Sequence, residues 1–203
     1  MNRIISVILS FVVMVGINSC GNNQINDAKE STGKKVAVLL VNHGSHSENW
    51  RQLLYDLDAN VRDSILKNPN IDGVKTAHME YTEPSIASRL KEFDNEGFDE
   101  IVVVPIFLTV SSHYSHDIPV ICGLSADPKI KASLAEEKIE VYSPKAKVTI
   151  APPLDYNTLL KKNVERRVKA LSKDTENEAI LLVAYVDEQY NQQWEELVTE
   201  IGK

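Results

Sequence analysis

Four short strand-like runs, separated by segments with a helical period, constrain the fold of this chain more than any other feature. The runs are 35–41, 73–81, 101–108 and 147–151. Apolar strands joined by crossover helices are typical of a parallel sheet that is buried on both faces. We therefore predict an α/β fold, an open parallel sheet flanked by helices, with the flavodoxin-like strand order 2-1-3-4.

Helical patterns lie between and after these runs. The first begins at Ser47, the second opens at Thr82-Glu83-Pro84 and closes at Gly97, the third covers 155–171, and 122–144 holds one short helix. The helical period predicts which apolar residues face inward. They are Trp50, Leu53, Leu54, Leu57, Val61 and Ile65, then Ile86, Leu90 and Phe93, and then Leu159, Leu160, Val164, Val168 and Leu171.

Four of the five histidines form two His-x-x-His clusters, each placed just after a predicted strand. His43 and His46 follow the first run, and His113 and His116 follow the third. In the predicted strand order the first and third strands are neighbours, so His43 and His113 should emerge together at the ligand-binding edge of the sheet. Imidazole is the commonest metal-binding side chain and titrates near neutral pH. The clusters therefore predict a site that holds a divalent metal and moves protons.

Glu80, at the end of the second run, is expected to flank His43. The alternative for Glu80 is a solvated carboxylate, and the alternative for His43 is a turn residue before a helix. His78 is interpreted as a packing residue, and Cys122 as a small buried one without a redox role. His46 and His116 are additional candidate metal ligands.

The N-terminal segment predicts export. Arg3 precedes an apolar stretch, 4–15, that is too short to span a bilayer comfortably, and a small residue then precedes Cys20. This pattern is typical of a bacterial lipoprotein signal, with cleavage before Cys20 and lipidation of its thiol; a buried N-terminal helix is the alternative. The expected location is the cell envelope, lipid-anchored to a membrane and facing the periplasm. The formal net charge of −7 argues against nucleic acid as a partner.

The C-terminal segment echoes the first strand and helix. Residues 178–183, followed by Trp194 and Leu197, resemble 36–41 followed by Trp50 and Leu53. This indicates either the first unit of a second, related lobe or a chance likeness between two strand–helix units. Tyr185, Asp187 and Glu188, at the corresponding edge of this copy, are weak candidates for more than a structural role. The predicted organisation is a signal peptide at 1–19, a flexible tether at 20–34, the α/β domain at 35–172 and a partial repeat at 173–203.

Five motifs in series resemble the CbiX family of sirohydrochlorin chelatases, class II chelatases that insert cobalt, nickel or ferrous iron into a tetrapyrrole. The motifs are 39–45, Glu80 with 83–85, 102–108, His113 with 117–119, and 151–154. The resemblance covers about 35–171. The resemblance implies that the domain is a chelatase lobe. It also implies that the histidines matching His43 and His113 bind the metal and take pyrrole protons, and that the glutamate near the position of Glu80 assists. Family members frequently carry a basic residue where this chain has His46 and His116.

The resemblance implies a lyase of cobalamin or sirohaem synthesis whose substrates are a tetrapyrrole and a divalent metal. No nucleotide cofactor is signalled, because the chain has neither a G-x-G-x-x-G motif nor a P-loop. The alternative is a non-catalytic envelope lipoprotein that binds haem, tetrapyrrole or metal. A homodimer could supply a second lobe in either case. A histidine phosphatase would need Arg directly before His43, where this chain has Asn42.

Overall fold

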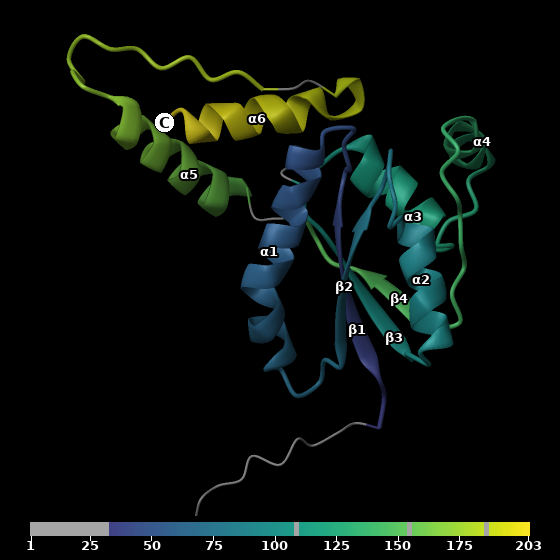
Figure 1. Ribbon diagram of the computed structural model, residues 1–203. Coiled ribbons are helices and arrows are strands. Elements are labelled where there is room, and N and C mark those ends of the chain that lie inside the picture. The colour runs from purple at the N-terminus through teal and green to yellow at the C-terminus, as the bar shows by residue number, and fades with distance from the viewer. Residues whose placement is uncertain (1–32, 108–109, 154–155, 185–186) are drawn as a thin grey trace, which may run out of the picture.

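A four-stranded parallel sheet forms the centre of the fold in the computed structural model, which describes residues 33–107, 110–153, 156–184 and 187–203. The strands are β1 (Val36–Asn42), β2 (Gly73–His78), β3 (Glu100–Pro105) and β4 (Lys147–Ile150), in the order β2-β1-β3-β4 (Figure 1). All three pairings are parallel, with Leu40 of β1 beside Thr76 of β2 and Val104 of β3. The predicted fold class and strand order are confirmed.

Helices cover both faces of the sheet. On one side lies α1 (Glu48–Leu66), and on the other lie α2 (Ile86–Asn95), α3 (Ile118–Ile121) and α4 (Pro128–Glu136) (Figure 1). Because side chains alternate along a strand, β1 contributes side chains to the hydrophobic cores on both faces of the sheet. Its Leu39 packs in the larger core with α2 and α3, and its Leu40 packs in the smaller core with α1.

The inward face of α2 matches the prediction, because Ile86, Leu90 and Phe93 are all buried. In α1 the stripe formed by Leu54, Leu57, Val61 and Ile65 packs on the sheet. Trp50 and Leu53 were wrongly placed in this stripe, since their exposed fractions are 59% and 58%. Leu53 lies one residue off the stripe, and Trp50 lies in the first turn of the helix.

Two predicted strands end earlier than expected. β2 stops at His78, after which the chain bends until α2 begins at the N-cap Ser85. β3 stops at Pro105, whose nitrogen has no hydrogen to donate to a neighbouring strand. Both ends lie at the same edge of the sheet, so the early stops lengthen the loops there.

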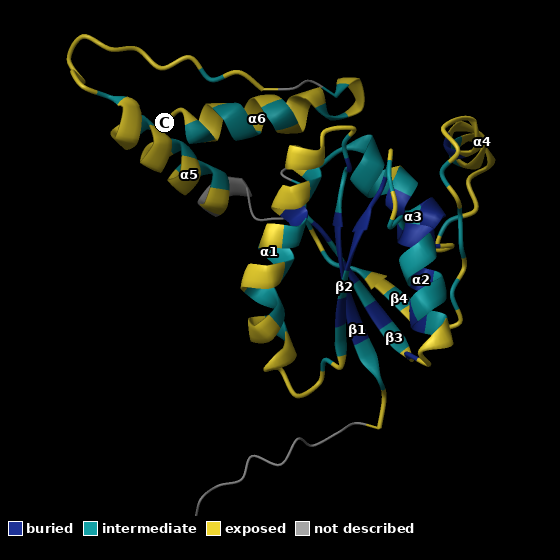
Figure 2. Cartoon of the chain, in the orientation of Figure 1, coloured by how far each residue is buried: buried dark blue, intermediate teal, exposed yellow. Residues whose placement is uncertain are grey.

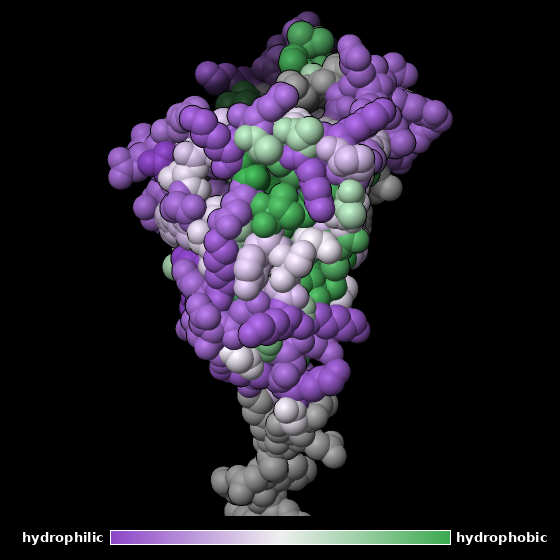
Figure 3. Space-filling view, turned by 90° about the vertical axis from the view of Figure 1, so that its right-hand side faces the viewer, coloured by the Kyte–Doolittle hydropathy of each residue, from purple (hydrophilic) through white to green (hydrophobic). Residues whose placement is uncertain are grey.

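The C-terminal part lies outside the two cores. α5 (Tyr156–Leu171) packs against α6 (Asn191–Ile201), and neither carries a fully buried residue among those whose burial is described (Figures 1 and 2). Leu159 and Leu171 are exposed, which contradicts their predicted inward placement. The C-terminal half of α5 and residues 178–182 line most of a cavity of about 580 Å³. The face of the domain on the right of Figure 1, over α2 and α4, is largely hydrophilic with hydrophobic residues in its centre (Figure 3).

The predicted strand of the partial repeat is absent. Residues 178–184 form no strand, and Ile180, Leu181 and Val183 are exposed. An apolar run becomes a strand only where another strand accepts its hydrogen bonds, and no strand within the described ranges pairs with it. Residues 178–184 therefore do not form the strand with which a second lobe would begin, while the expected helix is present as α6.

The N-terminal predictions, including the signal peptide and Cys20, fall on residues 1–32, outside the described part of the chain. No helix within the described residues is long and apolar enough to cross a membrane. Cys122 is a buried free cysteine, as expected, and burial raises the pKa of its thiol to about 12. A thiol with so high a pKa stays protonated at neutral pH, which supports a packing role.

Candidate metal site at the carboxyl edge of the sheet

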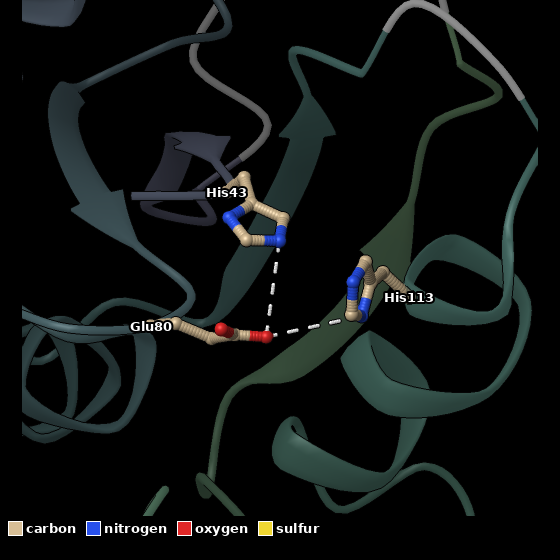
Figure 4. A group of neighbouring side chains, drawn as sticks. All are labelled: His43, Glu80 and His113. Atoms are coloured by element: carbon tan, nitrogen blue, oxygen red, sulfur yellow. Dashed lines mark ion pairs between the residues drawn. The ribbon is translucent and has the colours of Figure 1, made fainter. Parts of the chain in front are cut away.

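Three predicted residues meet at the carboxyl edge of the sheet: His43, Glu80 and His113 (Figure 4). One ligand atom from each lies within 4.8 Å of the others, and this is the only such cluster among the described residues. His43 follows β1, Glu80 follows β2, and His113 opens the short π-helix η1 (His113–Asp117) that leads into α3. The predicted convergence of His43 and His113 is confirmed.

Backbone pairing beyond the strand ends brings Glu80 beside His43. The N–H of Met79 donates to the carbonyl of Asn42, and the N–H of Glu80 donates to the carbonyl of His43, each at 2.9 Å. These two bonds tie the residues that follow β2 to the end of β1 and to His43. They hold the backbone of a histidine and a carboxylate side by side.

Asn42 organises the turn behind His43. Its side-chain Oδ1 accepts the N–H of Gly44 at 3.1 Å and lies 2.8 Å from Nδ1 of His78. His78 is buried, its Nε2 lies 3.3 Å from the hydroxyl of Tyr55, and burial lowers its pKa. The expected packing role of His78 is confirmed.

A single carboxylate oxygen faces both imidazoles. Oε1 of Glu80 lies 3.9 Å from Nε2 of His43 and 4.0 Å from Nδ1 of His113, and the two imidazole centroids are 4.9 Å apart. Two ligand atoms bound to one ion at about 2.1 Å can be at most about 4.2 Å apart. The distance to Nε2 of His43 falls within this limit, so an ion can lie between the carboxylate and that ring. The 4.0 Å distance shows that the His113 ring is close, but its Nδ1 is bonded to Asp117, so this ring would bind an ion through Nε2.

Burial is graded across the three side chains. Glu80 is only 11% exposed, whereas His43 and His113 are 40% and 33% exposed. A buried carboxylate beneath two more accessible imidazoles offers negative charge to a cation while leaving the outer side open. This arrangement fits a metal that must enter and leave.

Asp117 is paired with His113, although the sequence analysis quoted it only as part of a motif and gave it no role. Its Oδ2 lies 2.7 Å from Nδ1 of His113, one helical turn away. With Nδ1–H donated to Asp117, the lone pair of Nε2 is free for a metal or a proton, as in carboxylate–histidine–metal arrangements. The signal was the four-residue spacing, which brings the two together only once this segment is helical.

The bond to Asp117 raises the pKa of His113, with the charges of Asp117 and Glu80 acting in the same direction against burial. Because this pKa lies above the ordinary 6.5, the protonated ring stabilises the fold below pH 6.5, and that contribution disappears as pH rises through the raised pKa. Metal binding has the opposite dependence, because it needs the neutral ring.

We therefore expect metal affinity to fall, on acidification, at a pH above that expected for an ordinary histidine. In Asp117→Asn the lost charge should lower the His113 pKa and move this fall to lower pH, and metal affinity at high pH should drop about 10-fold. Titration of Co²⁺ affinity against pH measures both effects. An unchanged midpoint in Asp117→Asn would contradict the assignment.

The outer histidines lie outside the cluster. Both are exposed; the His46 ring is 4.4 Å from that of Tyr81, and Nε2 of His116 is 3.4 Å from the hydroxyl of Tyr190. The structure thus does not bring these two candidate ligands together with His43 and His113.

Tyr81 lies beside His43, although the sequence analysis gave it no role in the site. It has a positive φ of 69°, its ring is 5.7 Å from that of His43, and hydrogen bonding to Glu80 raises the pKa of its hydroxyl. A tyrosine in this backbone region is uncommon, and no pattern in the sequence indicated it. It forms an exposed aromatic wall beside the three central residues.

His43, Glu80 and His113 all lie within the part of the chain that matches known proteins. The CbiX family model matches residues 37–171. The sirohydrochlorin cobaltochelatase of Methanococcoides burtonii is 32% identical over 127 residues, which cover 63% of this chain and 89% of the relative. That of Saccharolobus solfataricus is 27% identical over 133 residues, or 66% of this chain and 93% of the relative.

A solved structure shares the fold. The sirohydrochlorin chelatase SirB from Bacillus subtilis subspecies spizizenii, in complex with cobalt, matches with a TM-score of 0.52 at 20% identity. The match covers 82% of this chain and 60% of SirB. At this identity the match supports the architecture alone.

Proposed function

Because this chain belongs to the CbiX family of chelatases, we propose that it inserts a divalent transition metal, cobalt, iron or nickel, into sirohydrochlorin or a related tetrapyrrole. The observation that carries the proposal is the single oxygen of Glu80 placed 3.9 and 4.0 Å from the two imidazoles. The family relationship supports the class of reaction, and this cluster supports His43, His113 and Glu80 as the residues that carry it out.

In the proposed mechanism the metal is a substrate that first binds to His43, His113 and Glu80. Imidazole suits cobalt, nickel and iron, and three protein ligands leave positions open for the incoming tetrapyrrole nitrogens. Asp117 holds the His113 ring in one tautomer.

Insertion of M²⁺ displaces two pyrrole protons, so charge balances only if two bases accept them. Each imidazole that releases the metal regains a lone pair, and it can then take one proton from the macrocycle. The Glu80 carboxylate stabilises the two imidazolium ions that form, because it faces both rings. The protons then leave to solvent through the partly exposed histidines.

The test is an anaerobic insertion assay with sirohydrochlorin and Co²⁺, Fe²⁺ or Ni²⁺. The change in the tetrapyrrole absorption spectrum measures the rate of insertion. We expect a rate proportional to protein concentration and well above the spontaneous rate of insertion. The matched control is His43→Ala at equal concentration. Binding of the tetrapyrrole without accelerated insertion would favour the non-catalytic binding protein instead.

We further propose that the domain is anchored to the cell envelope through lipidated Cys20, on the strength of the pattern at residues 1–20. Metabolic labelling with a fatty-acid analogue should mark the wild-type protein and fail to mark Cys20→Ala. Labelling that survives this substitution would rule the anchor out. The matched control is Cys122→Ala, which removes the other cysteine and should leave the labelling unchanged.

A further inference from the structure

The C-terminal segment reaches back to the helical turn that carries His113. Oδ2 of Asp187 accepts hydrogen bonds from both the backbone N–H and the hydroxyl of Ser112, each at 3.2 Å. Ser112 directly precedes His113 in the chain. Asp187 lies beyond residues 37–171, the part that matches the family, so this contact belongs to the additional C-terminal segment of this chain.

The Asp187 carboxylate is also held by a hydrogen bond within the C-terminal segment itself. Oδ1 accepts the N–H of Gln189 at 3.1 Å and so caps the short 3-10 helix η2 (Glu188–Tyr190), which continues into α6. Because α6 packs against α5, the turn that presents Asp187 is attached to the rest of the protein (Figure 1). One oxygen of Asp187 therefore serves its own turn and the other serves Ser112.

A second contact joins the same two segments. The hydroxyl of Tyr190 lies 3.4 Å from Nε2 of His116, one turn after Ser112. The two contacts span η1, so the C-terminal segment touches the turn on both sides of His113. The helical conformation begins at Ser112, and the first N–H groups of a helix lack partners within it, so an external carboxylate there stabilises the start of the turn.

The position of this turn matters because His113 depends on it. Its Nδ1 lies 2.7 Å from Asp117 and 4.0 Å from Glu80, and a small displacement of the turn changes the second distance. Outer partners of metal-binding histidines orient the rings in this way. Asp117 contacts the His113 ring directly, whereas Asp187 contacts Ser112, the residue that precedes His113 in the backbone.

We propose that Asp187 is a positioning residue of the metal site, which holds Ser112 and thereby sets His113 opposite His43 and Glu80. This inference rests on the proposed function in so far as those three residues bind metal. It assigns to the C-terminal segment a role in the site, in place of the second lobe that its sequence suggested.

The test compares Asp187→Ala with Glu188→Ala, which removes the same charge from the neighbouring, exposed position. Co²⁺ affinity is measured by competition with a chromophoric chelator, and thermal unfolding reports on the fold. We expect Asp187→Ala to weaken Co²⁺ binding about 10-fold and Glu188→Ala to change it less than about twofold. Asp187→Asn should recover part of the affinity, because its amide oxygen still accepts from Ser112.

A double-mutant cycle with Ser112→Ala isolates the contact. Ser112→Ala should cost less than Asp187→Ala, since the backbone N–H remains, and should add little to Asp187→Ala. Equal Co²⁺ affinities in Asp187→Ala and Glu188→Ala, or strictly additive effects in the cycle, would overturn the proposal.

Co²⁺ binding needs no tetrapyrrole, so this test is independent of turnover. If the wild type proves inactive in insertion, a selective loss of Co²⁺ affinity in Asp187→Ala still supports the positioning role. If the wild type is active, Asp187→Ala should lower kcat for insertion and leave KM for the tetrapyrrole nearly unchanged. Full activity and Co²⁺ affinity in Asp187→Ala would refute the positioning role while leaving the proposed function intact.

Discussion

His43→Ala and His113→Ala will each reduce metal insertion by about 10²–10⁴-fold, because each removes a metal ligand and a proton acceptor at once. The double mutant should be little worse than either single one, since the two rings face the same oxygen of Glu80 and act as a unit. Initial rates of insertion and Co²⁺ affinity measure the effect.

His46→Ala and His116→Ala are the matched controls. Both rings are exposed and lie outside the central cluster, so His46→Ala should cost less than about threefold, within the range of a surface change. His116→Ala also removes the contact with Tyr190, so it should cost somewhat more, but less than the loss of about 10-fold expected for Asp187→Ala. Losses as large as those of the inner pair would mean that four histidines bind the metal, and would favour a metal-binding lipoprotein over a chelatase.

Gly44→Ala will damage the site without removing any of its ligands. Gly44 has a φ of +92°, and a Cβ there would lie 2.2 Å from the carbonyl oxygen of Glu80. That backbone is fixed by the bond from the Glu80 N–H to His43, so the added carbon must push the Glu80 and His43 segments apart. We expect a loss of about 2–4 kcal/mol in the free energy of unfolding, from backbone strain and displacement together.

The same displacement should lower insertion about 100-fold, the cost of misplacing reacting groups by about 1 Å. Gly97→Ala is the control, because Gly97 also has a positive φ, of +72°, but a Cβ there meets nothing within 4 Å. It should cost about 1 kcal/mol of stability from strain alone and leave activity unchanged. Urea unfolding and insertion rates separate the two effects, and equal losses of activity in both variants would contradict the explanation.

The architecture could be predicted because it depends on patterns that are local in sequence. The alternation of strands and helices indicated a parallel sheet, the common flavodoxin-like order was expected for it, and that order placed His43 and His113 at one edge. Glu80 could be placed beside His43 because the two residues follow neighbouring strands in the expected order.

What could not be predicted depends on tertiary contacts. The run at 178–183 has the composition of a strand, but a strand needs a partner, and periodicity does not supply one. The pairing of Asp117 with His113 requires a helical turn at 113–117, where no helical pattern was identified. Asp187 is 75 residues from Ser112, and no local pattern connects two positions so far apart.

The metal site is tested most directly by a crystal structure of the protein soaked with Co²⁺, with the ion located by its anomalous scattering. We expect one principal site, with Co²⁺ bound by His43, His113 and Glu80 and with Asp117 still bonded to Nδ1 of His113. Cobalt bound at His46 or His116 instead, with the three central residues unliganded, would contradict this assignment.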